Sequence, residues 1–319
     1  MKAAIVETLG QPPAYGDFPD PHPTAGELRI AVTAAAITQI TKGRAAGMHY
    51  SGSAALPFVP GVDGVGRSDD GARVYFALPR APYGSMADWS VVAQAHCVRL
   101  PNDLDDVTAA AIANPGMSSW AAFKERARLR PGETVLINGA TGTSGRLAVQ
   151  IAKHLGARKV IATGRNAEAL AALSALGADV TIPLSGDGEA LERAFRPHFA
   201  ERIDVVLDYL WGPTAERLLI AAAKAAADAV PIRFVQIGSA SGAEITLPSA
   251  VLRASAIELM GSGIGSIPFD RLIAATGELL HATVPGGFKI SVDPVPLAEV
   301  RQAWAGDDGR RRTVLTIPQ

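Results

Sequence analysis

A glycine-rich stretch follows a short apolar run near the middle of the chain. The run 135–138 leads into Gly-Ala-Thr-Gly-Thr-Ser-Gly at 139–145, which differs from the dinucleotide-binding spacing GxGxxG only by alanine at the first glycine. Without a Cβ, Gly142 would let a pyrophosphate approach the backbone, and Gly145 would let the next helix pack closely on the strand. The N–H groups at the start of that helix would face the phosphates. The predicted cofactor contacts here are Ala140, Thr141, Gly142, Thr143, Ser144 and Gly145.

The same glycines would also suit an ordinary turn between a strand and a helix, so the motif must be weighed with its surroundings. It follows a buried apolar run and opens an amphipathic segment that Gly156 closes. A second apolar run at 159–163 then completes one βαβ unit. These surroundings favour a dinucleotide site.

The end of the second strand indicates which nucleotide is bound. NAD sites usually place Asp or Glu there for the ribose hydroxyls, yet no acidic residue occurs between Thr134 and Ala167. Arg165 follows Gly164 and can form charge-assisted hydrogen bonds to a 2′-phosphate, with Asn166 as a neutral partner. The sequence therefore predicts NADP, although a solvated arginine at the start of a loop remains the alternative for Arg165.

Length, charge and cysteine content limit the classes of protein to consider. A chain of 319 residues predicts two domains, and 30 basic against 31 acidic residues leave no electrostatic attraction to nucleic acid or to an anionic membrane. The single cysteine, Cys97, fits a reducing compartment, so we expect the cytoplasm. No targeting segment is evident at the N-terminus, and the longest Ala/Leu stretch, 218–230, is too short and too charged to span a membrane.

The pattern of apolar runs changes near residue 115. Up to about Ile112 the runs are short and bounded by Gly and Pro, which predicts strands and turns. Beyond it, strands at 135–138, 159–163, 204–208 and 233–238 alternate with helices at about 167–176 and 188–199. From about Ile267 we expect a last helix, then the segment KISVDPVP, a short helix at 297–304 and a terminal strand. The fold class is α/β with a parallel sheet.

Several segments, in order, resemble the medium-chain dehydrogenase/reductase superfamily and, within it, the zinc-independent quinone oxidoreductase branch that includes zeta-crystallin. They include MKAAIVETLG, LPFVPGVDGVG, YGSMADWSVV, LRPGETVLINGATGTSG, LGADVTI and IDVVLDYLWG. The resemblance implies a GroES-like β-rich catalytic domain, 1–115 completed by 267–319. It also implies a Rossmann NADP-binding domain with a doubly wound parallel sheet at 116–266. The family further implies a homodimer.

Positions that carry zinc ligands in the related alcohol dehydrogenases differ in this chain. Thr38 stands where those enzymes have a catalytic cysteine, and Gly61-Val62-Asp63 stands where they have Gly-His-Glu. Valine cannot ligate a metal, and threonine is a poor zinc ligand compared with Cys or His. We therefore predict no metal site.

Candidate substrate-site residues follow from the resemblance. Tyr50 lies close to the family's R-x-x-G-x-Y stretch and could donate a proton to a reduced carbonyl oxygen, although a loop tyrosine that packs its ring is the alternative. Thr38 and Asn114 match stretches that approach the nicotinamide, and Asn114 could equally form an Asn-Pro-Gly turn. Further cofactor contacts implied by the family are Ser118, Gly238, Ser239, Gly261, Ser262 and Gly263.

Without a metal to polarise the substrate, the favoured acceptors are those that take hydride readily. We predict an NADPH-dependent quinone oxidoreductase, with an enone or enal reductase, acting on a conjugated alkene, as the alternative. A nucleotide-sensing or nucleic-acid-binding protein that keeps the fold without catalysis is the alternative from another class. Near-zero net charge argues against nucleic acid as the partner of such a protein.

Overall fold

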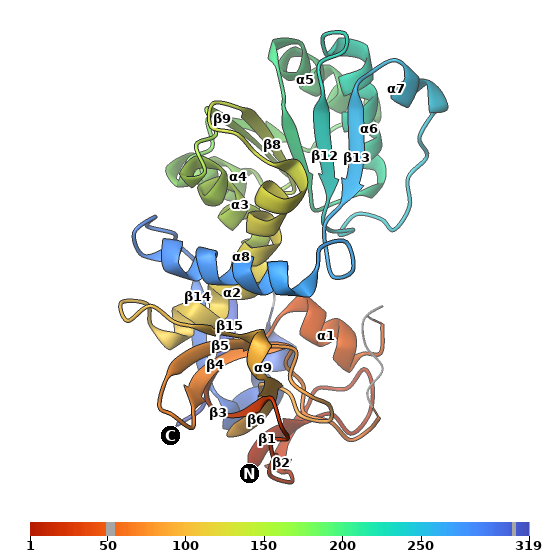
Figure 1. Ribbon diagram of the computed structural model, residues 1–319. Coiled ribbons are helices and arrows are strands. Elements are labelled where there is room, and N and C mark those ends of the chain that lie inside the picture. Colours follow the sequence, from red (N-terminus) through yellow and green to blue (C-terminus); the bar gives the residue numbers. More distant parts are fainter. Residues whose placement is uncertain (49–54, 308–310, 319) are drawn as a thin grey trace. The chain divides into compact units, whose positions relative to one another are not determined.

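The computed structural model describes residues 1–48, 55–307 and 311–318 (Figure 1). Contacts between Cα atoms divide the chain into two units. Unit 1 comprises Met1–Met117 and Pro268–Gln319, and unit 2 comprises Ser118–Ile267. The first boundary falls inside helix α2 (Asp106–Ala121), so no loop separates the units at this point.

Unit 2 holds a parallel six-stranded sheet in the order β10, β9, β8, β11, β12, β13. The strands are β8 (Thr134–Asn138), β9 (Lys159–Gly164), β10 (Val180–Pro183), β11 (Val205–Asp208), β12 (Ile232–Gln236) and β13 (Ile257–Gly261). The direction of winding reverses between β8 and β11, and ligands of such folds bind outside the carboxyl ends of the strands at this point. The predicted α/β class with a doubly wound parallel sheet is confirmed.

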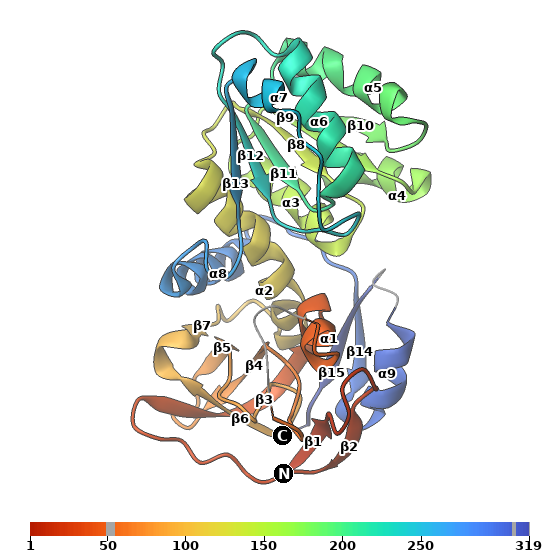
Figure 2. The same cartoon turned by 90° about the vertical axis from the view of Figure 1, so that its right-hand side faces the viewer.

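Helices pack on the sheet of unit 2 in two pairs. α3 (Thr143–His154) packs on β8 and β9, and α4 (Ala167–Ala171) packs on β9 and β10. α5 (Gly188–Glu201) and α6 (Gly212–Ala225) lie side by side (Figure 2) and bury Phe195 and Leu218 with Leu136 of β8 in one cluster. Each such side chain contributes about 1.5–3 kcal/mol when it leaves water. The short α7 (Ser249–Arg253) precedes β13.

Strands β3–β7 and the C-terminal strands β14 and β15 form the main sheet of unit 1, while β1 and β2 form a separate pair. β3 (Glu27–Ala36) pairs with β4 (Asp63–Ser68) and with the C-terminal strand β15 (Arg312–Thr316). The other strands are β1 (Lys2–Ile5), β2 (Ala14–Asp17), β5 (Arg73–Ala77), β6 (Trp89–Ala93), β7 (Cys97–Arg99) and β14 (Val292–Pro296). The remaining helices are α1 (Gln39–Ala45), α8 (Phe269–Thr283) and α9 (Val300–Gly306). Within the described ranges, no helix is both long and apolar enough to cross a bilayer.

The region expected to consist of strands and turns also contains helices. α1 interrupts it, and α2 starts at Asp106 and continues through the Asn-Pro-Gly sequence at 114–116, so no turn forms there. Packing explains why residue 116 is glycine, because a Cβ at this position would lie 2.6 Å from Leu279 of α8. The close approach of two helices, rather than a turn, accounts for this glycine.

Candidate functional site

Four predicted cofactor segments lie at one edge of the sheet in unit 2. They follow the carboxyl ends of β8, β9, β12 and β13, all of which run parallel. Because the carboxyl ends of parallel strands meet at a single edge, the segments 139–145, 164–166, 238–239 and 261–263 border the same region. The fold therefore gathers loops that lie far apart in the sequence.

Glycine occurs at three positions of the turn after β8 for different local reasons. Gly139 has φ +87°, and a Cβ there would lie 2.8 Å from Leu210. A Cβ on Gly145 would lie 2.5 Å from the carbonyl oxygen of Gly139, so α3 can pack on the turn only if this residue is glycine. At Gly142, by contrast, a Cβ would meet nothing within 4 Å. The open space at Gly142 is accessible to a ligand.

Helix α3 begins at this open space. Its N-cap is Gly142, which has no side chain to accept a hydrogen bond from the first turn, and no acidic residue stands in that turn. The first helical hydrogen bond runs from Arg146 N to Gly142 O, 2.9 Å. The partial positive charge at a helix N-terminus attracts anions. The arrangement suits a pyrophosphate.

Strand β9 ends beside the same turn. A Cβ on Gly164 would lie 2.4 Å from Thr141 Cγ2, so only glycine lets the two segments touch. Arg165 is exposed, and within the described part of the chain its guanidinium has no hydrogen bond or ion pair. Asn166 caps α4, with its Oδ1 accepting from Ala169 N at 2.8 Å. Arg165 is therefore available to a phosphate, whereas Asn166 already uses its side-chain oxygen.

A fully buried polar cluster lies at the ends of β8, β9 and β11. Thr163 Oγ1 donates to Asn138 Oδ1 (2.8 Å), and Asn138 Nδ2 donates to Asp208 Oδ1 (2.8 Å). Burial raises the pKa of Asp208, and hydrogen bonds from Asn138, Leu210 N and Trp211 N oppose this rise. Neither Asn138 nor Thr163 is among the predicted site residues. The signal that could have found them is a polar residue at the end of an otherwise apolar strand.

Gly238 and Ser239 follow β12. A Cβ on Gly238 would lie 2.8 Å from the carbonyl oxygen of Tyr209, so this residue packs on the loop after β11. Gly238 N also donates to Asp208 O at 3.2 Å. Ser239 is exposed at the same edge. The packing of Gly238 ties the loops after β11 and β12 together.

The segment 261–263 follows the edge strand β13. The carbonyl oxygen of Gly261 accepts from Arg126 Nε at 2.8 Å. Ser262 N donates to the backbone of β12 at 2.9 Å, and Gly263 N donates to Ser266 Oγ at 2.8 Å. Protein groups thus hold the backbone of all three residues.

Asn114 and Ser118 lie one turn apart on α2, and both are half-buried. Within unit 2, burial raises the pKa of the Tyr209 phenol to about 12, and the hydroxyls of Ser118 and Ser119 oppose this effect. Ser118 therefore neighbours the loop after β11, which borders the predicted cofactor site. Asn114 belongs to unit 1.

In unit 1, Thr38 is buried and serves as the N-cap of α1. Its Oγ1 accepts from Thr41 N at 3.2 Å and lies 2.9 Å from Thr41 Oγ1. The capping geometry explains why a residue of this type stands at the start of the helix. Tyr50, the predicted proton donor, lies outside the described residues.

Asp63 is a buried acid next to Val62 at the start of β4. Tyr75 donates its phenolic hydrogen to Asp63 Oδ2 at 3.0 Å. Burial raises the pKa of Asp63 to about 6, while the Tyr75 hydrogen bond and the charge of Arg312 lower it. Among the described residues, no group of three or more His, Cys, Asp or Glu side chains could hold a metal ion.

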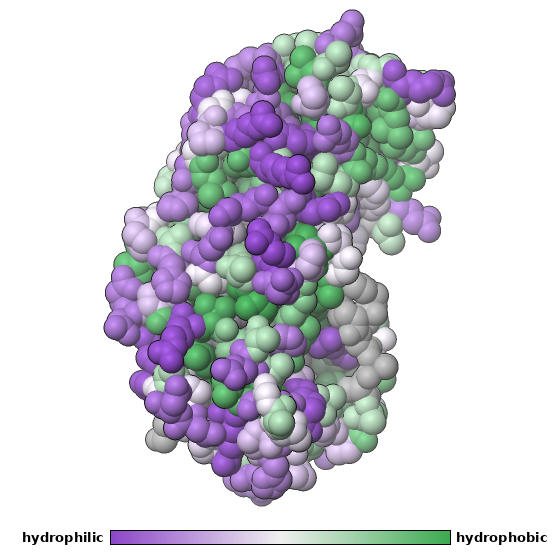
Figure 3. Space-filling view, viewed as in Figure 1, coloured by the Kyte–Doolittle hydropathy of each residue, from purple (hydrophilic) through white to green (hydrophobic). Residues whose placement is uncertain are grey.

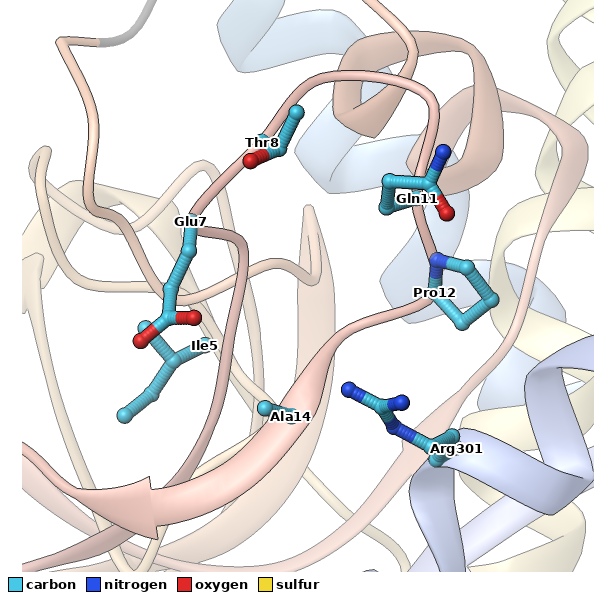
Figure 4. Close-up of a pocket in the computed structure, with 7 residues that line it drawn as sticks. All are labelled: Ile5, Glu7, Thr8, Gln11, Pro12, Ala14 and Arg301. Atoms are coloured by element: carbon cyan, nitrogen blue, oxygen red, sulfur yellow. The ribbon is translucent and has the colours of Figure 1, made fainter.

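Two cavities are found in the described structure. One, of about 560 Å³ in unit 2, is lined by Glu133, Asp204 and Arg233 near the amino ends of the strands and extends to Arg126 and Met260. The other, of about 200 Å³ in unit 1, is lined by Ile5, Glu7, Thr8, Gln11, Pro12, Ala14 and Arg301 (Figure 4). The second is smaller than the 300–1,000 Å³ usual for ligand pockets. Neither contains a predicted site residue.

Comparison with known families and curated proteins shows which proteins this chain resembles. A family described as zinc-binding dehydrogenase matches residues 145–282. The probable NADPH-dependent quinone reductase tdiC of Emericella nidulans is 30% identical over 361 aligned positions that cover 100% of both chains. Prostaglandin reductase-3 of Bos taurus is 26% identical over 75% of this chain and 65% of its own length.

A solved structure adds a resemblance in three dimensions. The quinone oxidoreductase of Thermus thermophilus, which was also solved in complex with NADPH, is 27% identical. The comparison covers 99% of this chain and 100% of that one, with a TM-score of 0.80. The architecture of the whole chain is therefore shared with that enzyme.

Proposed function

This chain belongs to the quinone oxidoreductase branch of the medium-chain dehydrogenase/reductase superfamily, and from that premise we propose that it reduces quinones with NADPH and without zinc. It is an NADP-dependent oxidoreductase. The observation that carries the proposal is the open N-terminus of α3 at Gly142, together with the exposed Arg165 at the end of β9, whose guanidinium pairs with no group in the described part of the chain.

The residues present fit NADP. The backbone at 142–145 would bind the pyrophosphate at the start of α3, and Arg165 would bind the 2′-phosphate. Bound NADPH supplies the hydride. The segments 238–239 and 261–263 would hold the ribose and nicotinamide through their backbones. The chain's contribution is to orient the cofactor and exclude water.

Zinc independence rests on the two positions at which related enzymes bind the metal. Thr38 uses its hydroxyl to cap α1, and Val62 is buried and has no ligating atom. The proton that follows hydride transfer would then come from a hydroxyl group or from water, and Tyr50 is the proposed donor. Thr38 and Asn114 would line the substrate site.

Reduction of an alkene conjugated to a carbonyl is the second candidate. The similarity to prostaglandin reductase-3 favours it. Hydride addition to an enone also produces an oxyanion that needs a proton, so the same site residues would serve both reactions.

The tests of function need only the purified chain. Loss of NADPH absorbance is followed with a quinone such as 1,4-benzoquinone and, in parallel, with an enal such as trans-2-hexenal. We expect a higher kcat/KM with the quinone. A higher value with the enal would favour the second candidate, and absence of turnover with both would contradict an oxidoreductase of either kind.

We also propose a homodimer that forms through β13. Among the described residues this strand pairs only with β12, so its outer edge is open. Leu259 is 41% exposed on it, and Figure 3 shows hydrophobic residues gathered around β13 and α6. A second copy can pair with this edge.

The single half-buried cysteine, Cys97, supports a reducing compartment such as the cytoplasm.

A further inference from the structure

Thr163 holds the start of the glycine turn with two different groups. Its side-chain Oγ1 accepts from Gly139 N at 3.1 Å, and its backbone oxygen accepts from Ala140 N at 2.8 Å. Gly139 adopts a left-handed backbone conformation, with φ +87°. The first two N–H groups of the turn are therefore tied to the end of β9 by one residue.

The hydrogen bonds that start at this threonine run in one direction. The Thr163 hydroxyl accepts from Gly139, so its hydrogen is left to donate to Asn138 Oδ1. The amide of Asn138 must then turn its Nδ2 toward Asp208. An amide carries a donor and an acceptor and can reverse, whereas an ionised carboxylate only accepts. The Gly139 N–H can only donate, so Asp208 at the other end determines the direction of the two side-chain bonds, from Asn138 to Asp208 and from Thr163 to Asn138.

Asp208 also holds the loop that packs on the glycine turn. Its Oδ1 accepts from Leu210 N at 3.0 Å, and its Oδ2 accepts from Trp211 N at 3.1 Å. The Leu210 side chain lies against Gly139, and Trp211 has a left-handed φ of +55°. A non-glycine residue in that conformation needs surrounding bonds to hold it.

We propose that Thr163, Asn138 and Asp208 form a positioning relay that holds the glycine turn in the geometry that binds the nucleotide phosphates. Asp208 provides the fixed acceptor at its end. The inference rests on the proposed NADPH site, which it deepens. All three side chains are fully buried under the turn, so they act through Gly139 and Ala140.

Thr163→Val and Thr163→Ser form the first test pair. Valine has nearly the same shape but leaves Gly139 N without its acceptor, whereas serine keeps the hydroxyl. We expect valine to raise the Kd and the KM for NADPH about tenfold, a typical effect of one unpaired buried donor, and serine to restore most of the affinity. The kcat at saturating NADPH should stay within about twofold, because the bound cofactor reacts in the same place.

Exchange of the amide and the carboxylate is the second test. Asp208→Asn removes the fixed acceptor and should weaken NADPH binding. The double variant Asn138→Asp/Asp208→Asn places a carboxylate next to Thr163 and an amide next to Leu210 N. The Thr163 hydroxyl then again donates to a fixed acceptor at position 138, so its oxygen can accept from Gly139 N. We expect the double variant to bind NADPH more tightly than Asp208→Asn alone. If Thr163→Val does not fold, the comparison of Asp208→Asn with the double variant still tests whether the three side chains position the glycine turn.

The outcomes separate this inference from the proposed function. A wild-type protein that does not bind NADPH overturns both. Wild-type binding combined with unchanged affinity in folded Thr163→Val overturns the relay alone, and so does a double variant that binds no better than Asp208→Asn. A purely structural role would lower thermal stability and leave the Kd of the folded fraction unchanged.

Discussion

Arg165 is the charged side chain on which our prediction of an NADPH preference rests. It is exposed at the end of β9, and in the described part of the chain nothing else pairs with its guanidinium. We expect Arg165→Ala to raise the Kd for NADPH by roughly tenfold to a hundredfold, as loss of a charge-assisted hydrogen bond does, and to leave the Kd for NADH almost unchanged. Titration of the variant with both nucleotides measures this difference.

Arg193→Ala is a matched control for Arg165, because Arg193 is an exposed arginine on α5 of the same unit. It should change neither affinity. If Arg165→Ala weakens NADH and NADPH equally, the arginine does not read the 2′-phosphate, and the predicted cofactor preference has another origin.

Asp63 gives the stability of unit 1 a dependence on pH. Burial raises the pKa of this carboxyl from 3.8 to about 6 in the folded chain. Between these values the unfolded chain releases its proton first, so the free energy of unfolding falls as pH rises from about 4 to about 6. Asp63→Asn keeps an oxygen for Tyr75 and does not titrate. We expect it to be about 2–3 kcal/mol more stable than wild type above pH 7 and nearly equal near pH 4.

Chemical denaturation at pH 4 and pH 7.5 measures the effect of Asp63→Asn. Asp103→Asn, at an exposed carboxyl, provides the control and should alter stability little at either pH. A stability difference between Asp63→Asn and wild type that is the same at both pH values would show that the buried carboxyl does not produce the pH dependence.

At the scale of elements, the turn between β8 and α3 contains one glycine that we expect to matter for cofactor binding and another that we expect to matter for stability. Gly142→Ala and Gly145→Ala add the same methyl group three residues apart. The first methyl meets nothing within 4 Å, while the second would lie 2.5 Å from the backbone oxygen of Gly139. We expect Gly142→Ala to weaken NADPH binding by about tenfold with little loss of stability. Gly145→Ala should cost about 1–3 kcal/mol of stability.

Nucleotide titration and thermal melting of both glycine variants provide the test. Each variant is the control for the other, because the side-chain change is identical. A Gly142→Ala protein that binds NADPH as well as wild type would mean that the phosphates do not approach this part of the turn.

Sequence pattern predicted most elements of unit 2, because each arises from local periodicity. The predicted strands 135–138 and 159–163 correspond to β8 and β9, and the predicted helix at 188–199 corresponds to α5. The pattern left a turn open as one alternative at 114–116, and the structure places Asn-Pro-Gly inside α2 instead. Packing against α8 at Gly116 stabilises that helix, and packing partners cannot be read from local sequence.

At the scale of the whole molecule, we expect a homodimer because the outer edge of β13 pairs with no other described strand. We predict that the wild type has twice the chain mass of 33.1 kDa in solution. Leu259→Lys places a charge on the edge strand and should shift the protein to the monomer with little effect on folding, because Leu259 is 41% exposed in the single chain. Light scattering coupled to size exclusion gives both masses. A wild-type mass of one chain would contradict the dimer.

The sequence by itself determined the α/β class, the glycine turn and the acid-free end of β9 with Arg165, and it carried the prediction of zinc independence from Thr38 and Val62. Each depends on residue type and short spacing, which a linear pattern contains. Only the tertiary structure decided that Thr163, Asn138 and Asp208 meet under the turn. These residues come from three strands, and their contacts depend on strand order and register, which are set by the packing of the whole sheet.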